Sequence, residues 1–175
     1  MMRTTRQLAH ALVLLLGISA AANADWRQFR GPGGLGTSDE KELPTTWSAQ
    51  KNLVWKTRLP GAGSSSPMFV GERIFLTCYS GYAQEQKDPG KMEDLMRHLL
   101  CVEQKSGKIL WTKEFNPELP EHKYQGEGSY HGYSSSTPTT DGERLYVFFG
   151  KSGLFCFDLD GKELWHTSVG TGTNG

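Results

Sequence analysis

The stretch SSSTPTTDGERLYVFFGKSGLFCFDLDGKELW, residues 134–165, contains four short β-rich runs separated by tight turns. The runs are SSTPTT, RLYVFFG, LFCFDL and KELWHTSV, the last of which continues to residue 169. The turns between them contain Asp141-Gly142, Ser152-Gly153 and Asp160-Gly161. Glycine supplies the positive φ that such hairpin turns require, and aromatic and β-branched residues favour strands. The pattern therefore predicts a four-stranded antiparallel meander.

The same pattern occurs earlier in the chain. SSSPMFVGERIFL at 64–76 aligns with SSTPTTDGERLYV at 135–147, and CVEQKSGKILW at 101–111 aligns with CFDLDGKELW at 156–165. Trp55, Trp111 and Trp165 recur at spacings of 56 and 54 residues. Self-similarity at a near-constant period indicates a repeat architecture, and repeated four-stranded units are typical of the blades of a β-propeller. We predict an all-β β-propeller fold of four-stranded antiparallel blades, with two complete blades and one outer strand of a closing blade, residues 52–58.

The number of repeats bears on the extent of the chain. Propellers close with about four to eight blades, and residues 52–58 match an outer strand that no earlier strands precede. We therefore expect the sequence to be part of a longer protein. The alternative is a native two-blade unit that covers its open sheet faces by forming oligomers.

Residues 1–24 have the pattern of a signal peptide. A basic start with Arg3 and Arg6 precedes an apolar run, and Ala22-Asn23-Ala24 gives a small-x-small cleavage pattern. The apolar run is short and interrupted, which argues against a stable membrane span. We expect cleavage near Ala24 and a periplasmic or secreted mature protein.

The mature chain divides into an N-terminal segment, residues 25–51, and a partial propeller domain, residues 52–175. Without Arg3 and Arg6 it has 17 Lys and Arg against 19 Asp and Glu, a net charge of about −2, and no basic stripe. Nucleic acid is therefore not an expected partner. GPGGLG in the N-terminal segment resembles a phosphate-binding loop, but no strand precedes it, so we expect a coil that packs over the propeller.

Two inserts mark the predicted ligand-binding face. Residues 80–98 lie between the second and third strands of the first repeat, where KMEDLMRHLL is expected to make one or two helical turns; residues 116–133 form an irregular loop between the repeats. In an antiparallel blade both connections leave on the same face. The candidate ligand-binding residues are His122, Tyr124, Tyr130, His131 and Tyr133. Their spacing matches no metal motif, and a solvated loop is the alternative; we assign no catalytic or metal-binding residue.

The cysteines give no clear redox motif. Cys101 and Cys156 occupy the same position in successive repeats, so adjacent sheets would hold them about 10 Å apart. That separation is too large for a disulfide. Buried, apolar thiols are expected, and a Cys78–Cys101 pair is left open.

The segments Cys101–Trp111 and Cys156–Trp165 resemble the PQQ-like, quinoprotein-type β-propeller repeat. Its tryptophan-docking motif has a small residue, an acid or amide two positions later, Thr/Ser-Gly-Lys and a closing Trp. Ser106-Gly107-Lys108 matches it, whereas the second copy lacks one residue before Gly161. The resemblance implies blade docking, and not ligand binding, for Trp55, Trp111, Trp165, Gly107 and Gly161.

The resemblance leaves two functions open. The family includes PQQ-dependent dehydrogenases, with PQQ and Ca²⁺ on the propeller axis, and a non-enzymatic assembly factor for outer-membrane β-barrels. The adjacent Cys-Cys pair of the former and the lipid-attachment cysteine of the latter are missing here. Our leading hypothesis is an exported binding or scaffolding module with an unknown protein or glycan partner and no assignable cofactor. The alternative is a quinoprotein oxidoreductase for alcohols or sugars, with PQQ and Ca²⁺ held by residues on missing blades.

Overall fold

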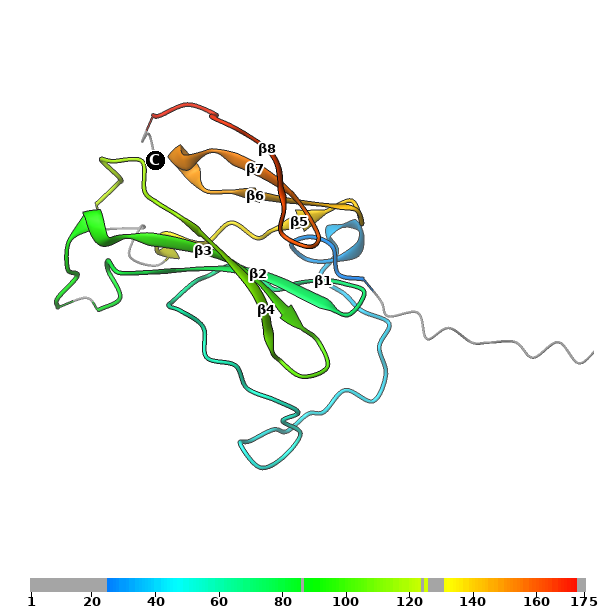
Figure 1. Cartoon of the computed structure of the whole chain (residues 1–175). Coiled ribbons are helices and arrows are strands. Elements are labelled where there is room, and N and C mark those ends of the chain that lie inside the picture. Colours follow the sequence, from blue (N-terminus) through cyan, green and yellow to red (C-terminus); the bar gives the residue numbers. More distant parts are fainter. Residues whose placement is uncertain (1–24, 86, 124, 126–130, 173–175) are drawn as a thin grey trace, which may run out of the picture.

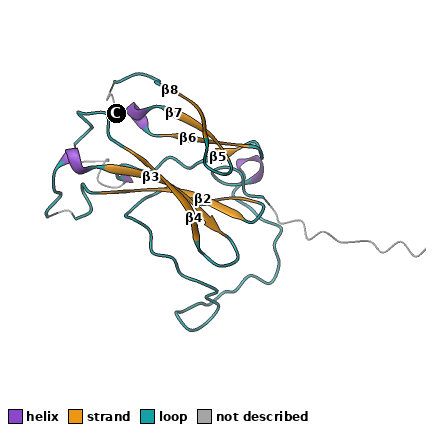
Figure 2. Cartoon of the chain, viewed as in Figure 1, coloured by secondary structure: helices purple, strands orange, loops and turns teal. Residues whose placement is uncertain are grey.

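The computed structural model describes residues 25–85, 87–123, 125 and 131–172 (Figure 1). The predicted signal peptide and the candidate residues Tyr124 and Tyr130 lie outside these ranges. Two four-stranded sheets form the structure (Figure 2). Among the described residues no helix could cross a membrane.

Each sheet is a meander of consecutive antiparallel strands. Blade 1 consists of β1 (Met68–Val70), β2 (Arg73–Ser80), β3 (Met96–Glu103) and β4 (Ile109–Phe115). Blade 2 consists of β5 (Thr139–Thr140), β6 (Arg144–Phe148), β7 (Leu154–Asp158) and β8 (Glu163–Thr167). Three 3-10 turns complete the elements: η1 (Pro32–Gly34), η2 (Met92–Asp94) and η3 (Gly150–Ser152). The predicted all-β class and the two predicted blades are confirmed.

The strand register supports the sequence alignment of the two repeats. Phe75 pairs with Cys101 in blade 1, and the equivalent Tyr146 pairs with Cys156 in blade 2. Both blades also shift register directly after that cysteine, between the third and fourth strands. The two repeats therefore share a local irregularity as well as a strand order.

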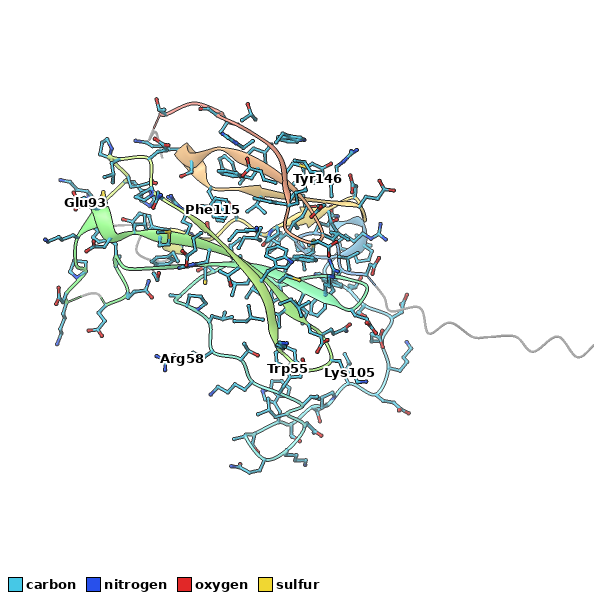
Figure 3. All side chains as sticks on the ribbon, in the orientation of Figure 1. Trp55, Arg58, Glu93, Lys105, Phe115 and Tyr146 are labelled. Atoms are coloured by element: carbon cyan, nitrogen blue, oxygen red, sulfur yellow. The ribbon has the colours of Figure 1, made fainter. Side chains whose placement is uncertain are left out.

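The main core lies between the blades. Alternate residues of each strand point to one sheet face, so Met68, Phe75 and Leu99 of blade 1 meet Leu145 and Phe157 of blade 2. The first four of these side chains are fully buried, and burial of each stabilises the fold by about 1.5–3 kcal/mol. Figure 3 shows Phe115, whose ring completes this core, between the two sheets.

Tryptophan–glycine contacts join successive parts of the fold. A Cβ atom on Gly107 would lie 2.4 Å from the Trp55 ring, and one on Gly161 would lie 3.0 Å from the Trp111 ring. The Trp55 indole N–H also donates a hydrogen bond to the Gln104 carbonyl at 2.8 Å. Only glycine allows the indole rings to approach the turns this closely. Trp165, the third member of the series, is 43% exposed.

The N-terminal segment and the serine runs link the two innermost strands. Trp26 exchanges backbone hydrogen bonds with Phe69 at 2.9 and 2.8 Å, and the Arg27 carbonyl accepts one from the Thr140 N–H at 3.0 Å. The Ser64 N–H donates to the Ser134 carbonyl at 3.0 Å. The start of the N-terminal segment therefore pairs with the blades, whereas residues 35–51 are exposed, so the packing expected of this segment is limited to its start.

Three expectations need correction or completion. Residues 52–58 form no assigned strand, because no neighbouring strand pairs with them, and Val54 is 88% exposed. The helical turns expected in KMEDLMRHLL reduce to η2, since residues from Met96 onward pair with β2 along their whole length. The three cysteines are free and buried, which resolves the Cys78–Cys101 question, and burial raises the pKa of the Cys101 thiol to about 11.

The docked and the exposed tryptophan provide a matched test. Trp111→Ala should lower the free energy of unfolding by about 3 kcal/mol, because it opens a cavity at the blade junction. Trp165→Ala, at the equivalent position, should lower the free energy of unfolding by less than about 1 kcal/mol. Urea denaturation followed by circular dichroism measures both. Equal losses would contradict the docking role of Trp111.

A buried histidine should make blade 1 sensitive to acid. His98 is 4% exposed and shares a 2.7 Å hydrogen bond with the Ser80 hydroxyl through Nε2, while Glu114 lies 3.7 Å from Nδ1. Burial lowers the pKa of His98 below 6.5, and the Glu114 carboxylate only partly opposes this. The unfolded chain therefore binds the proton more readily, so stability is complete above the unfolded pKa and falls as the pH drops below it. Urea midpoints at about pH 7.5 and about pH 5.5 should differ less in His98→Gln than in the parent protein.

Candidate functional site

The two inserts pack together at one end of the sheets. Tyr82 and Leu95 of the first insert and Tyr133 of the second form a buried cluster with Tyr79. Figure 1 shows both inserts at the end of blade 1 opposite the β3–β4 turn, and Figure 3 places Glu93 and Lys105 at these opposite ends. The shared face expected from the strand connections is therefore present.

A buried ion pair fixes the second insert to blade 1. The side chains of Arg97, in β3, and Glu121 are 4% and 3% exposed, and Nη2 lies 2.7 Å from Oε1. Arg97 Nε also donates a hydrogen bond to the Tyr133 carbonyl at 2.9 Å. Two buried charges require such pairing, because desolvation of either one alone is costly. Arg97 therefore holds the insert at two points, on either side of its middle part.

Tyr133 has a structural role in this arrangement. It is 4% exposed, its ring stacks on His122 at 4.6 Å between centroids, and its hydroxyl donates to the His122 carbonyl at 2.8 Å. Burial strongly raises the pKa of the Tyr133 hydroxyl, with the neighbouring Tyr82 adding to the effect. Of the candidate ligand-binding residues, Tyr133 is thus closed to a ligand, whereas His122 and His131 are exposed.

A cleft of about 720 Å³ opens beside the ion pair. Its lining includes a basic set: His122, Lys123, His131 and Lys151. The Lys151 amino group donates a hydrogen bond to the Pro120 carbonyl, which joins the insert to blade 2. Among the described lining residues the only acidic side chain is Glu121, and Arg97 neutralises it. The cleft therefore presents an excess of positive charge.

Serines and phenylalanines supply the rest of the wall. Ser134, Ser135 and Ser136 line the cleft together with Phe148 and Phe149. Ser134 is 2% exposed, and its hydroxyl has no hydrogen-bond partner among the described residues. A buried hydroxyl without a partner is destabilising, so this wall has unused hydrogen-bonding capacity. Phe148 is 43% exposed and adds an apolar surface.

Acidic and metal-ligating side chains near this face have other roles in the part of the chain that the structure describes. Within the described ranges there is no group of three or more His, Cys, Asp or Glu side chains that could hold a metal ion. The acidic turn at 158–161 closes the β7–β8 hairpin: the Asp158 carboxylate accepts hydrogen bonds from the N–H groups of Asp160 and Lys162 at 3.0 and 2.8 Å.

Arg97, Ser134 and Lys151 are absent from the candidate ligand-binding residues named from the sequence. One signal was available for Arg97, which stands inside the apolar run LMRHLL. A charged residue within a buried strand must find a partner. The partner of Arg97 depends on how the second insert folds back onto blade 1. The local sequence pattern does not predict that path.

Removing one partner of the buried ion pair should strongly destabilise the fold. Glu121→Ala should lower the free energy of unfolding by about 3–5 kcal/mol, because it leaves the Arg97 charge buried without a partner. Glu118→Ala, an exposed position in the same insert, should change it by no more than about 0.5 kcal/mol. Thermal and urea denaturation of both variants measure the difference. A small effect of Glu121→Ala would mean that the insert does not depend on this pair.

A family model described as outer membrane protein assembly factor BamB matches residues 35–175. No curated protein matches the chain. The family match covers both blades, the docking tryptophans and both inserts. The chain belongs to this family of PQQ-like β-propeller repeat proteins.

Proposed function

We propose that the protein is an exported β-propeller binding module whose cleft receives an acidic segment of a partner protein. The excess of basic groups in the cleft is the observation that carries this proposal. The description of the matching family, an outer-membrane protein assembly factor, supports a protein partner and a periplasmic location.

The cleft has three kinds of contact for such a segment. In this proposal Lys123, His122 and His131 bind the carboxylates of the partner segment. Arg97 does not take part, because it is already paired with Glu121. The hydroxyls of the serine run can donate to peptide carbonyls, and the exposed part of Phe148 can pack on an apolar side chain. Contacts between exposed charges accelerate association and weaken with salt. We therefore expect a moderate, salt-sensitive affinity.

A pair of labelled peptides tests the site. A peptide of alternating Glu and Phe should bind the full chain in fluorescence anisotropy, and one of alternating Lys and Phe should not. Combining Lys123→Glu with His131→Glu should weaken binding about tenfold or more through charge repulsion. Lys105→Glu, on the β3–β4 turn at the opposite end (Figure 3), is the matched control and should leave binding unchanged. Equal binding of both peptides, or equal effects of the variants, would remove the cleft as the site.

A glycan is the other class of partner. Sugar rings stack on exposed aromatic side chains, and Tyr133 is too buried to offer such a surface. Among the tyrosines named from the sequence, stacking would thus depend on Tyr124 and Tyr130, which lie outside the described residues. Oligosaccharide binding that disappears in Tyr124→Ala/Tyr130→Ala and persists in Lys123→Glu/His131→Glu would favour this alternative over the peptide site.

A PQQ-dependent oxidoreductase is the alternative of a different class. In the portion of the chain that is described, no donor set fits the Ca²⁺ that accompanies PQQ, so we derive no catalytic step from these residues. The test is to add PQQ, Ca²⁺ and an alcohol or sugar and to follow dye reduction. Turnover would show that the protein is an enzyme and would contradict the proposal of a binding module.

A further inference from the structure

A groove of about 380 Å³ lies between β4 of blade 1 and the strands β7 and β8 of blade 2. It opens where the core between the blades ends: Phe157 belongs to that core, while Phe115 and Phe155 pack at its margin (Figure 3). The groove shares no lining residue with the basic cleft of the insert face. It is therefore a second concave surface, with a different composition.

The floor of the groove is aromatic. Phe155 and Phe157 alternate onto the side of β7 that faces blade 1, and their rings are nearly parallel, with 12° between planes and 6.3 Å between centroids. The Phe115 ring meets Phe155 edge-on at 4.8 Å, and the His166 ring stacks on Phe155 at 5.5 Å. Phe115 and Phe155 are both half-buried. The partly exposed faces of such rings are negative and attract a cation within about 6 Å.

The rim of the groove is acidic. Glu114 and Glu118 on the side of blade 1 and Glu163 on the side of blade 2 are exposed lining residues, against the single ammonium group of Lys113. Glu163 Oε1 lies 2.7 Å from His166 Nδ1. The groove therefore combines aromatic rings with an excess of negative charge, the opposite of the basic cleft.

The Glu114 carboxylate is not neutralised by its buried neighbour. Glu114 Oε1 lies 3.7 Å from His98 Nδ1, which is too long for a hydrogen bond, and Nδ1 has no other partner within the described ranges. Burial lowers the pKa of His98 below 6.5, so the imidazole is neutral at about pH 7.5. Both the carboxylate and the buried nitrogen behind it thus remain without a cationic partner.

We propose that this groove binds an arginine side chain from a basic segment of a partner protein. A guanidinium is planar, so it can lie on the phenylalanine rings while its forked N–H groups donate to carboxylates on both walls. The ammonium of lysine is compact and strongly hydrated, and it cannot make both contacts at once. The proposal concerns a different site from the peptide cleft and stands or falls independently of it.

Three labelled peptides of equal length test the ligand class by fluorescence anisotropy with the full chain at about pH 7.5. One alternates Arg and Gly, the second alternates Lys and Gly, and the third has citrulline, the neutral isostere, in place of Arg. The arginine peptide should bind about tenfold or more tightly than the lysine peptide, and the citrulline peptide should not bind. Equal binding of the arginine and lysine peptides would overturn the proposal, because general charge attraction would then explain both.

Paired variants test the location. Glu114→Gln combined with Glu163→Gln should weaken binding of the arginine peptide about tenfold or more. The matched control, Glu72→Gln with Glu143→Gln, makes the same charge change at exposed positions of the β1–β2 and β5–β6 turns and should leave binding unchanged. Urea midpoints equal to that of the parent protein show that both pairs are folded. Equal effects of the two pairs would overturn the proposal.

The aromatic contact has its own test. Phe155→Leu keeps the floor apolar but removes the ring face, so the arginine peptide should bind about threefold more weakly. Its urea midpoint shows whether the variant is folded at the temperature of the binding experiment. Unchanged binding would overturn the stacking of the guanidinium on this ring.

Discussion

The contact between an indole ring and a glycine in the next turn is the constraint on which the structure depends. A four-stranded sheet with an apolar face must bury that face against another layer to be stable. Trp55 and Trp111 each cover the turn of the following blade, at Gly107 and Gly161, and so bring the sheet faces together. Stability in such an architecture is largely a sum of contacts between neighbours. The interior of each sheet could therefore vary in sequence while the junction positions remain restricted.

The blades and the insert face follow different physical rules. The junction between the blades is apolar and is built from residues that alternate along short strands. The insert face instead depends on one buried ion pair, an aromatic cluster and polar contacts from Lys151. A buried pair contributes less net stability than an apolar core but imposes a definite geometry on its partners. An irregular loop can thus hold a cleft in place without strands of its own.

The blades were predictable because their signals are local. Glycine turns, alternating apolar residues and the recurring tryptophan define each meander, and comparison of the repeats sets the register. Residues 96–100 were misread because Met, Leu and Arg are good helix formers, whereas pairing with β2 overrides that preference. Tyr133 was expected at the surface, because it lies in a polar loop. Its burial depends on the chain returning to Tyr79 and Tyr82, and no local pattern encodes that contact.

The backbone pairing of Trp26 and Arg27 also bears on how the protein folds. Each meander brings together residues close in sequence, and such contacts form early at small entropic cost. The N-terminal segment instead contacts β5 across 112 residues, from Arg27 to Thr139. Because closing so long a loop is costly in entropy, we expect this contact to form after both meanders, where it joins the two innermost strands. The residues that are synthesised first are therefore expected to join the fold last.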